Sequence, residues 1–174
     1  MKKAFAMLVF LTVPLWMIPH GGDKDAAGAA SSSADAVAKK EIAAPAGKAY
    51  DCTYFTLTLA KGWDAGPLTF GMVNVLPKGK VSPGLYFKFE GDGNAAGTAE
   101  GSIETMVKNY GGSPMEDSAI AGIGFKTTTY TYSGMTQTMH VAYRNGTKIT
   151  ITIEGVSAKD NPDIKAMLGS VVLK

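Results

Sequence analysis

Cysteine and histidine, two residue types on which metal binding and acid–base chemistry often depend, are nearly absent. The chain of 174 residues has one cysteine, Cys52, and two histidines, His20 and His140. A single thiol excludes an intramolecular disulfide and a zinc site built from paired cysteines. The sequence contains no catalytic motif, and we expect neither a metal nor a cofactor.

Net charge is also lacking once the N-terminus is set aside. The chain has 17 basic and 15 acidic residues, and Lys2 and Lys3 lie in the N-terminal leader, which leaves fifteen of each sign. A neutral domain has no basic surface for a phosphate backbone. We therefore expect no nucleic-acid partner, and membrane contact only through the leader if it stays uncleaved.

Residues 1–20 have the layout of a secretory signal. Lys2 and Lys3 precede Ala4–Ile18, an uncharged apolar run of 15 residues, and signal peptides have this order of charge and apolar residues. The run is shorter than the roughly 20 residues that cross a hydrocarbon core as a helix, and Pro14 interrupts it. We expect a periplasmic or otherwise extracytoplasmic protein.

Residues 21–49 change to alanine, serine and glycine without a large apolar side chain before Ile42. Such a segment buries too little apolar surface to offset the entropy cost of ordering it. We expect a flexible tether here that folding does not need. The remaining residues, 50–174, have the length and composition of one globular domain.

The first half of this domain predicts strands followed by one helix. Apolar residues alternate along 54–59, and further apolar runs at 70–76 and 85–89 are separated by prolines and glycines. Ile103, Met106, Val107 and Tyr110 then follow helical spacing, which predicts an amphipathic helix that ends at Gly111.

The second half predicts a three-stranded meander over 120–132, 135–144 and 147–154. Ser133–Gly134 and Asn145–Gly146 are two-residue hairpin turns by their sequence. If both turns are that short, His140 lies opposite Thr127 and Ile151 on the face that forms the core. We therefore expect His140 to be a buried structural residue and not a general base, and Cys52 to be a buried or strand-edge thiol.

The other face of the meander is rich in tyrosine and methionine. It carries Tyr130, Met139 and Tyr143, and Tyr132 follows close by. An uncovered face of this composition is a candidate surface for a ligand or a partner. The alternative is that the predicted C-terminal helix after Asn161, with apolar residues Ile164, Met167 and Leu168, lies on this face and buries it.

The layout resembles the PsbP-like superfamily, which includes the P subunit of the photosynthetic oxygen-evolving complex and a Ran-release factor. The resemblance is carried by Tyr54–Trp63 (YFTLTLAKGW), the helix in the middle of the chain, the long meander, and a terminal helix followed by Gly169–Lys174 (GSVVLK). It implies an α+β fold, an antiparallel sheet of about six strands between helical layers. It also implies binding to other proteins, because most family members act that way.

Three functions remain open from the sequence. The first is an exported, non-catalytic binding or scaffold protein of the cell envelope, with another envelope protein as its partner. The second is a small-ligand binder with a pocket between helix and sheet. The third is a hydrolase that uses His140.

Overall fold

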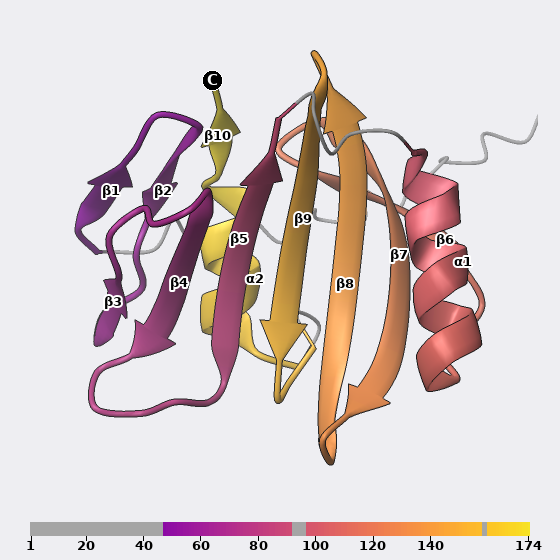
Figure 1. Cartoon of the computed structure of the whole chain (residues 1–174). Helices are drawn as coiled ribbons and strands as arrows, with labels where there is room; N and C mark the ends of the chain where they lie inside the picture. Colours follow the sequence, from indigo (N-terminus) through magenta and orange to yellow (C-terminus); the bar gives the residue numbers. More distant parts are fainter. Residues whose placement is uncertain (1–46, 92–96, 158–159) are drawn as a thin grey trace, which may run out of the picture. The chain divides into compact units, whose positions relative to one another are not determined.

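The structure is a computed structural model that describes residues 47–91, 97–157 and 160–174, all within one compact unit (Figure 1). The predicted leader and almost all of the predicted tether lie outside the described residues. The described part is α+β, with two antiparallel sheets and two helices.

The larger sheet has seven antiparallel strands in the order β3-β4-β5-β9-β8-β7-β6. Its centre is the predicted meander, and the predicted strands at 70–76 and 85–89 are β4 and β5. The bounds are β3 Trp63–Ala65, β4 Met72–Pro77, β5 Gly84–Glu90, β6 Glu116–Ile120, β7 Ile123–Tyr132, β8 Met135–Arg144 and β9 Thr147–Glu154.

The smaller sheet has three strands in the order β1-β2-β10, which span Ala49–Asp51, Phe55–Thr58 and Val172–Leu173. The alternation predicted for 54–59 is confirmed, because Phe55 and Leu57 are fully buried and Thr56 and Thr58, which follow them, are not. The C-terminus pairs with β2, with Val172 opposite Thr56. The two ends of the domain therefore meet in one sheet.

Short turns fix the register of the meander as predicted. His140 pairs with Thr127 on β7 and with Ile151 on β9. The prediction of one strand over 120–132 is wrong, because Ala121 and Gly122 have positive φ angles of 54° and 74° and form a further two-residue turn. This turn adds the edge strand β6 before β7.

Each helix is capped by a side chain of its own sequence. Helix α1, Ala99–Tyr110, begins at Thr98, whose hydroxyl accepts a hydrogen bond from the Gly101 N–H at 3.0 Å, and it ends at Gly111. Helix α2, Pro162–Gly169, begins at Asn161, whose side chain accepts from the Ile164 N–H. These caps satisfy backbone groups that helix ends leave without partners.

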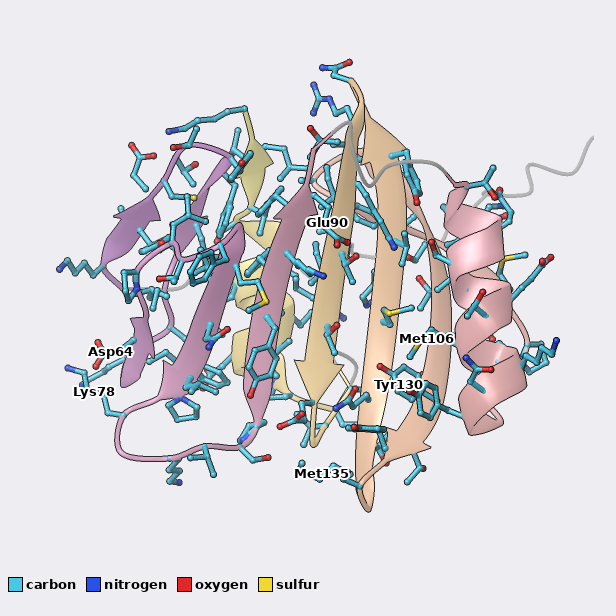
Figure 2. All side chains as sticks on the ribbon, viewed as in Figure 1. Asp64, Lys78, Glu90, Met106, Tyr130 and Met135 are labelled. Atoms are coloured by element: carbon cyan, nitrogen blue, oxygen red, sulfur yellow. The ribbon has the colours of Figure 1, made fainter. Side chains whose placement is uncertain are left out.

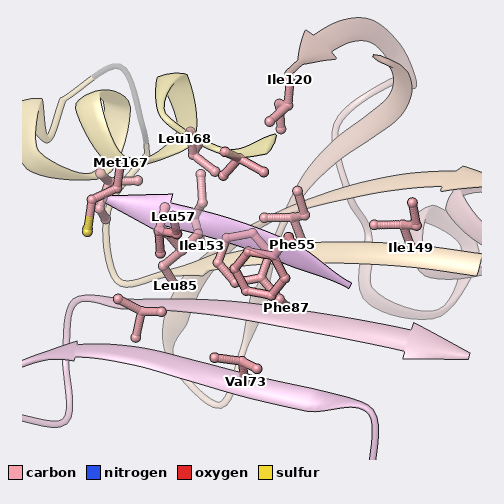
Figure 3. Close-up of a cluster of buried hydrophobic side chains, with 14 of the residues drawn as sticks. Phe55, Leu57, Val73, Leu85, Phe87, Ile120, Ile149, Ile153, Met167 and Leu168 are labelled. Atoms are coloured by element: carbon pink, nitrogen blue, oxygen red, sulfur yellow. The ribbon is translucent and has the colours of Figure 1, made fainter. Parts of the chain in front are cut away.

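The two helices lie on opposite faces of the larger sheet (Figure 1). Helix α2 and β2 cover one face, and the main core fills the space between them and strands β4, β5 and β9 (Figure 3). Helix α1 covers β7 and β8 on the other face. The structure confirms a sheet between helical layers, with seven strands where about six were predicted.

Trp63 closes one end of the main core. It is 6% exposed, and its indole N–H donates to the Asp163 carboxylate at 3.1 Å. This bond links β3 to the first turn of α2, where an acidic side chain also interacts favourably with the helix dipole.

Candidate functional site

His140 lies in the middle of β8 and is the most unusual polar side chain of the core. Its ring is 8% exposed and meets the edge of the Phe125 ring, with the ring centroids 6.4 Å apart. The register explains this position, since the two short turns of the meander place it on the face shared with Ile151. The prediction that His140 is a buried residue of this face is confirmed.

Three polar atoms form a triangle at this position. Nδ1 of His140 is 2.8 Å from the Thr127 hydroxyl and 3.2 Å from the Ser118 hydroxyl, and the two hydroxyls are 2.7 Å apart. Ser118 comes from the edge strand β6, which the sequence analysis did not predict. The other ring nitrogen of His140, Nε2, is buried and has no hydrogen-bond partner among the described residues.

Burial lowers the pKa of His140 from 6.5 to about 4. The cause is desolvation, which disfavours the charged imidazolium in the protein interior. At neutral pH the ring is therefore uncharged, and one of its two nitrogens carries a proton while the other accepts a hydrogen bond.

A cavity of about 320 Å³ lies beside His140. One wall is formed by residues 118–121 of β6 and its turn, and another by Lys165, Leu168 and Gly169 of α2. The cavity therefore lies where the edge of the larger sheet meets the second half of α2. Its volume is within the range of small-molecule sites in proteins.

Ser118 and Thr127 are the two residues of the described part of the domain whose hydroxyls contact a histidine, and Ser118 also lines the cavity. Catalysis by a hydroxyl and a histidine needs a base that can take up a proton near neutral pH and a third group that orients that base. A pKa of about 4 makes His140 a weak base, and Nε2 has no orienting carboxylate. Thr127 also lies closer to Nδ1 than Ser118 does.

Cys52 lies in the smaller sheet, in the connection between β1 and β2, and it is half-buried against the main core. His140, the histidine of the described residues, makes no hydrogen bond to this thiol, because its Nδ1 contacts Ser118 and Thr127 and its Nε2 has no partner. The described residues also contain no cluster of three metal-ligating side chains.

The four residues predicted as a binding surface have different environments. Tyr130 and Met139 are 7% and 8% exposed, Tyr143 is half-buried, and Tyr132 is 49% exposed. Helix α1 covers the first three, with Ile103 fully buried against them. The expectation that this face is either open or covered by the C-terminal helix is wrong on both counts, since α2 lies on the opposite face.

The hydroxyl of Tyr130 begins a chain of hydrogen bonds across four strands. It donates to Gln137 at 2.7 Å, Gln137 donates to one oxygen of Glu154 at 2.8 Å, and Tyr86 donates to the other oxygen at 3.4 Å. Desolvation raises the pKa of the Tyr130 hydroxyl, with smaller effects of neighbouring acidic groups in the same direction. Tyr130 therefore acts within the sheet and is unavailable to a partner.

Exposed apolar side chains remain at the end of the β7–β8 hairpin. We call Tyr110, Tyr132 and Met135 the aromatic patch; their side chains are 41%, 49% and 38% exposed. The rings of Tyr110 and Tyr132 meet edge to face, with centroids 5.4 Å apart. Figure 2 shows Met135 at the hairpin end and Tyr130 between β8 and the lower end of α1.

Solved structures with the same fold support the resemblance drawn from the sequence. Cyanobacterial PsbP (CyanoP) from Synechocystis is 12% identical, with a TM-score of 0.50, over 73% of this chain and 92% of that one. A protein from Bacteroides thetaiotaomicron is 11% identical, also with a TM-score of 0.50, over 74% of this chain. This chain covers 48% of that protein's length, about half. The chain therefore has a PsbP-like fold.

A further similar structure is LpqN, described as involved in cell envelope biogenesis of Mycobacterium tuberculosis. It is 11% identical, with a TM-score of 0.43, over 74% of this chain and 86% of that one. No family model and no curated protein matches the chain. Neither helix of the described residues is long and apolar enough to cross a membrane.

Proposed function

We propose that this chain is an exported protein of the cell envelope and that its folded domain binds another envelope protein without catalysing a reaction. The observation that carries this proposal is the aromatic patch. Tyr110, Tyr132 and Met135 present apolar surface that no described residue covers. Tyrosine and methionine are enriched at protein interfaces, because they supply large contact areas at low entropic cost or adapt to irregular surfaces.

The proposed lack of catalysis rests on His140. Its low pKa and the absence of an orienting group at Nε2 leave Ser118 without an effective base. The proposed export rests on the leader, with Lys2 and Lys3 before the apolar run Ala4–Ile18. Fractionation of cells that produce the full chain tests it, and recovery of intact, unprocessed chain in the cytoplasm would contradict export.

Capture from an envelope extract tests the partner. We expect the wild-type chain to retain a specific protein, and the double variant Tyr132→Ser/Met135→Ser to lose it. The matched control is Val81→Ser, which removes an apolar side chain that is 82% exposed in the loop between β4 and β5. Equal capture by the double variant and the control would contradict a role of the aromatic patch.

Hydrolysis is the second candidate, because Ser118 and His140 are 3.2 Å apart. An assay with para-nitrophenyl acetate, a reactive ester, distinguishes the two functions. We expect no turnover that depends on Ser118. A loss of ester cleavage in Ser118→Ala, with folding unchanged, would favour the hydrolase.

A further inference from the structure

Strand β6 forms one edge of the larger sheet and leaves one side of its backbone open. It pairs with β7 over its whole length, and among the described residues no backbone hydrogen bond joins it to any other segment. Four of its five residues are exposed or half-buried, and Ile120 is buried. Alternate N–H and C=O groups of such an edge strand point away from the sheet and can pair with a further strand.

A cavity lies beside β6 on each face of the sheet. On the α2 face it is the cavity of about 320 Å³ between residues 118–121 and the second half of α2. On the α1 face a second cavity, of about 490 Å³, extends from the first turn of α1 across Asp117 to Gly124. Successive side chains of a strand point to opposite faces, so a strand added to β6 would reach the two cavities in turn.

Small side chains keep the cavity on the α1 face open. Ala119 of β6 lies opposite Gly124 of β7, and Ala119 is exposed. A Cβ placed at Gly124 would meet no atom within 4 Å apart from its chain neighbours. This part of the sheet edge therefore has room for a long side chain from a neighbouring strand.

The two cavities differ in charge. The one on the α1 face has two carboxylates, Glu100 and Asp117, and one ammonium, Lys126, which contacts them at 3.4 and 2.7 Å. The Asp117 side chain is 81% exposed, so a second cation can approach it from the open side. The cavity on the α2 face has the exposed Lys165 as its one charged side chain and Ile120 in its apolar wall. The first cavity suits a basic side chain and the second an apolar one.

We propose that β6 binds an extended segment of another protein by strand addition, and that this segment alternates basic and apolar residues. Its basic side chains lie against Asp117 and Glu100 on the α1 face, and its apolar side chains lie against Ile120 and α2 on the other face. Backbone hydrogen bonds supply the affinity in this mode of recognition, and the side-chain pockets supply the selectivity. A second copy of β6 does not fit, because Glu116–Ile120 has no basic residue and would bring two further carboxylates.

Three capped five-residue peptides, added separately to the full chain and followed by NMR, test strand addition. The probe is Val-Lys-Val-Lys-Val. Val-Glu-Val-Glu-Val reverses its charge, and Val-Lys-Pro-Lys-Val keeps the charge but has a proline that does not fit the interior of a strand. We expect the probe to give saturable shifts at residues 116–121 and to slow hydrogen exchange of the β6 amides, and each control peptide to bind at least fivefold more weakly.

The peptide series can contradict the proposal in three ways. Absence of saturable shifts at millimolar probe would overturn binding at this edge. Equal binding of the glutamate peptide would overturn the preference for basic residues. Equal binding of the proline peptide would overturn strand addition, because charge alone would then explain the interaction.

Substitutions test the acidic side of the edge. Asp117→Asn is expected to fold normally, because its side chain is exposed, and to weaken binding of the lysine peptide at least threefold. Asp64→Asn is the matched control, since Asp64 lies on β3 at the opposite edge of the sheet, is 67% exposed and also pairs with a lysine, Lys78. We expect this control to bind the peptide like the wild type. Unchanged binding in Asp117→Asn, or an equal loss in Asp64→Asn, would overturn the role of Asp117.

Two other occupants of this edge are detected without any peptide. A second copy of the chain would protect the β6 amides only at high protein concentration, together with a dimer in sedimentation. The N-terminal segment of the chain would protect them in the full chain and not after deletion of residues 21–46. Either result would overturn the proposal.

This proposal does not rest on the aromatic patch. Capture of an envelope protein that the Tyr132→Ser/Met135→Ser variant loses, with no peptide binding, would overturn only strand addition. Peptide binding that this double variant leaves unchanged, with no partner captured, would overturn only the role of the aromatic patch.

Discussion

A buried imidazole makes the stability of this domain depend on pH through His140. In the unfolded chain its pKa is the ordinary 6.5, whereas burial lowers the pKa to about 4 in the folded domain. Between these two values the unfolded state holds a proton that the folded state lacks, so acid favours unfolding. As the pH falls from 6.5 to 4, we expect protonation of His140 to lower the free energy of unfolding by about 3 kcal/mol. Above pH 6.5, His140 is expected to have almost no effect on the pH dependence of stability.

The variant His140→Gln isolates this effect in denaturant titrations at several pH values. It keeps every carboxylate, so the difference in pH slope between wild type and variant belongs to His140. We also expect the variant to be less stable at pH 7 by about 1 kcal/mol or more, because it changes a buried hydrogen bond to Thr127. Parallel slopes of the two proteins would show that His140 is protonated in the folded state at mildly acidic pH.

The backbone conformation of Phe70 is expected to lower the stability of the folded domain. It occupies the first position of a two-residue turn with φ of +51°, and its side chain is 96% exposed. Asn145 occupies the same position of the β8–β9 turn with φ of +49°. Asparagine tolerates this left-handed region far better than phenylalanine does.

We expect Phe70→Asn to raise the free energy of unfolding by about 1 kcal/mol, since it relieves backbone strain and gives up almost no burial. The reciprocal variant Asn145→Phe should lower the free energy of unfolding by a similar amount. Thermal or chemical denaturation of both variants checks the pair. A loss of stability in Phe70→Asn would mean that the ring contributes to the folded state despite its exposure.

At the scale of elements, a chain of hydrogen bonds joins β7, β8, β9 and β5. Tyr130 belongs to this chain and Tyr132 does not, so the two tyrosines of β7 are expected to differ in their effect on stability. Tyr130→Phe removes the hydroxyl that donates to the Gln137 side-chain oxygen at 2.7 Å. Gln137 is buried, so this oxygen then loses its donor. We expect a loss of about 1–3 kcal/mol in the free energy of unfolding. Tyr132→Phe, on the same strand but half-exposed, is the matched control and should change stability by less than about 0.5 kcal/mol.

Local sequence signals predicted the elements whose geometry is determined by residues adjacent in the sequence. Ser133–Gly134 and Asn145–Gly146 define tight turns, and the turns alone determine the register that buries His140. The hairpin at Ala121–Gly122 was missed because alanine rarely adopts a positive φ and because apolar residues continue through it. Ser118, and with it one side of the cavity, depends on that hairpin and was missed for the same reason.

The assignment of each helix to a face could not come from a local signal. Both α1 and α2 carry an apolar stripe, and either stripe fits the Tyr130 face by composition. The choice depends on where the chain crosses from β5 to β6 and from β9 to β10, which is a property of the whole fold. Strands of three residues, such as β1 and β3, are likewise too short to show a period of their own.

At the scale of the whole molecule, the domain is expected to be independent of the N-terminal segment that precedes it. The described structure begins at Gly47, and the Lys48 carbonyl accepts a hydrogen bond from Leu59 N–H at 3.0 Å. Strand β1 follows directly and pairs with β2, with Tyr50 opposite Leu57. A deletion that ends at Ala46 leaves all of these contacts in place.

We therefore expect deletion of residues 21–46 to leave the melting temperature within about a degree, because this stretch offers few apolar side chains that could dock on the domain. Deletion of residues 21–51 is the control, since it also removes β1 and the contact between the Tyr50 and Phe55 rings, whose centroids are 5.8 Å apart. That longer deletion should lower the melting temperature by several degrees, as expected when a paired strand is lost. Calorimetry of the three proteins separates the outcomes, and a large drop already in the shorter deletion would mean that residues 21–46 pack against the domain and are no tether.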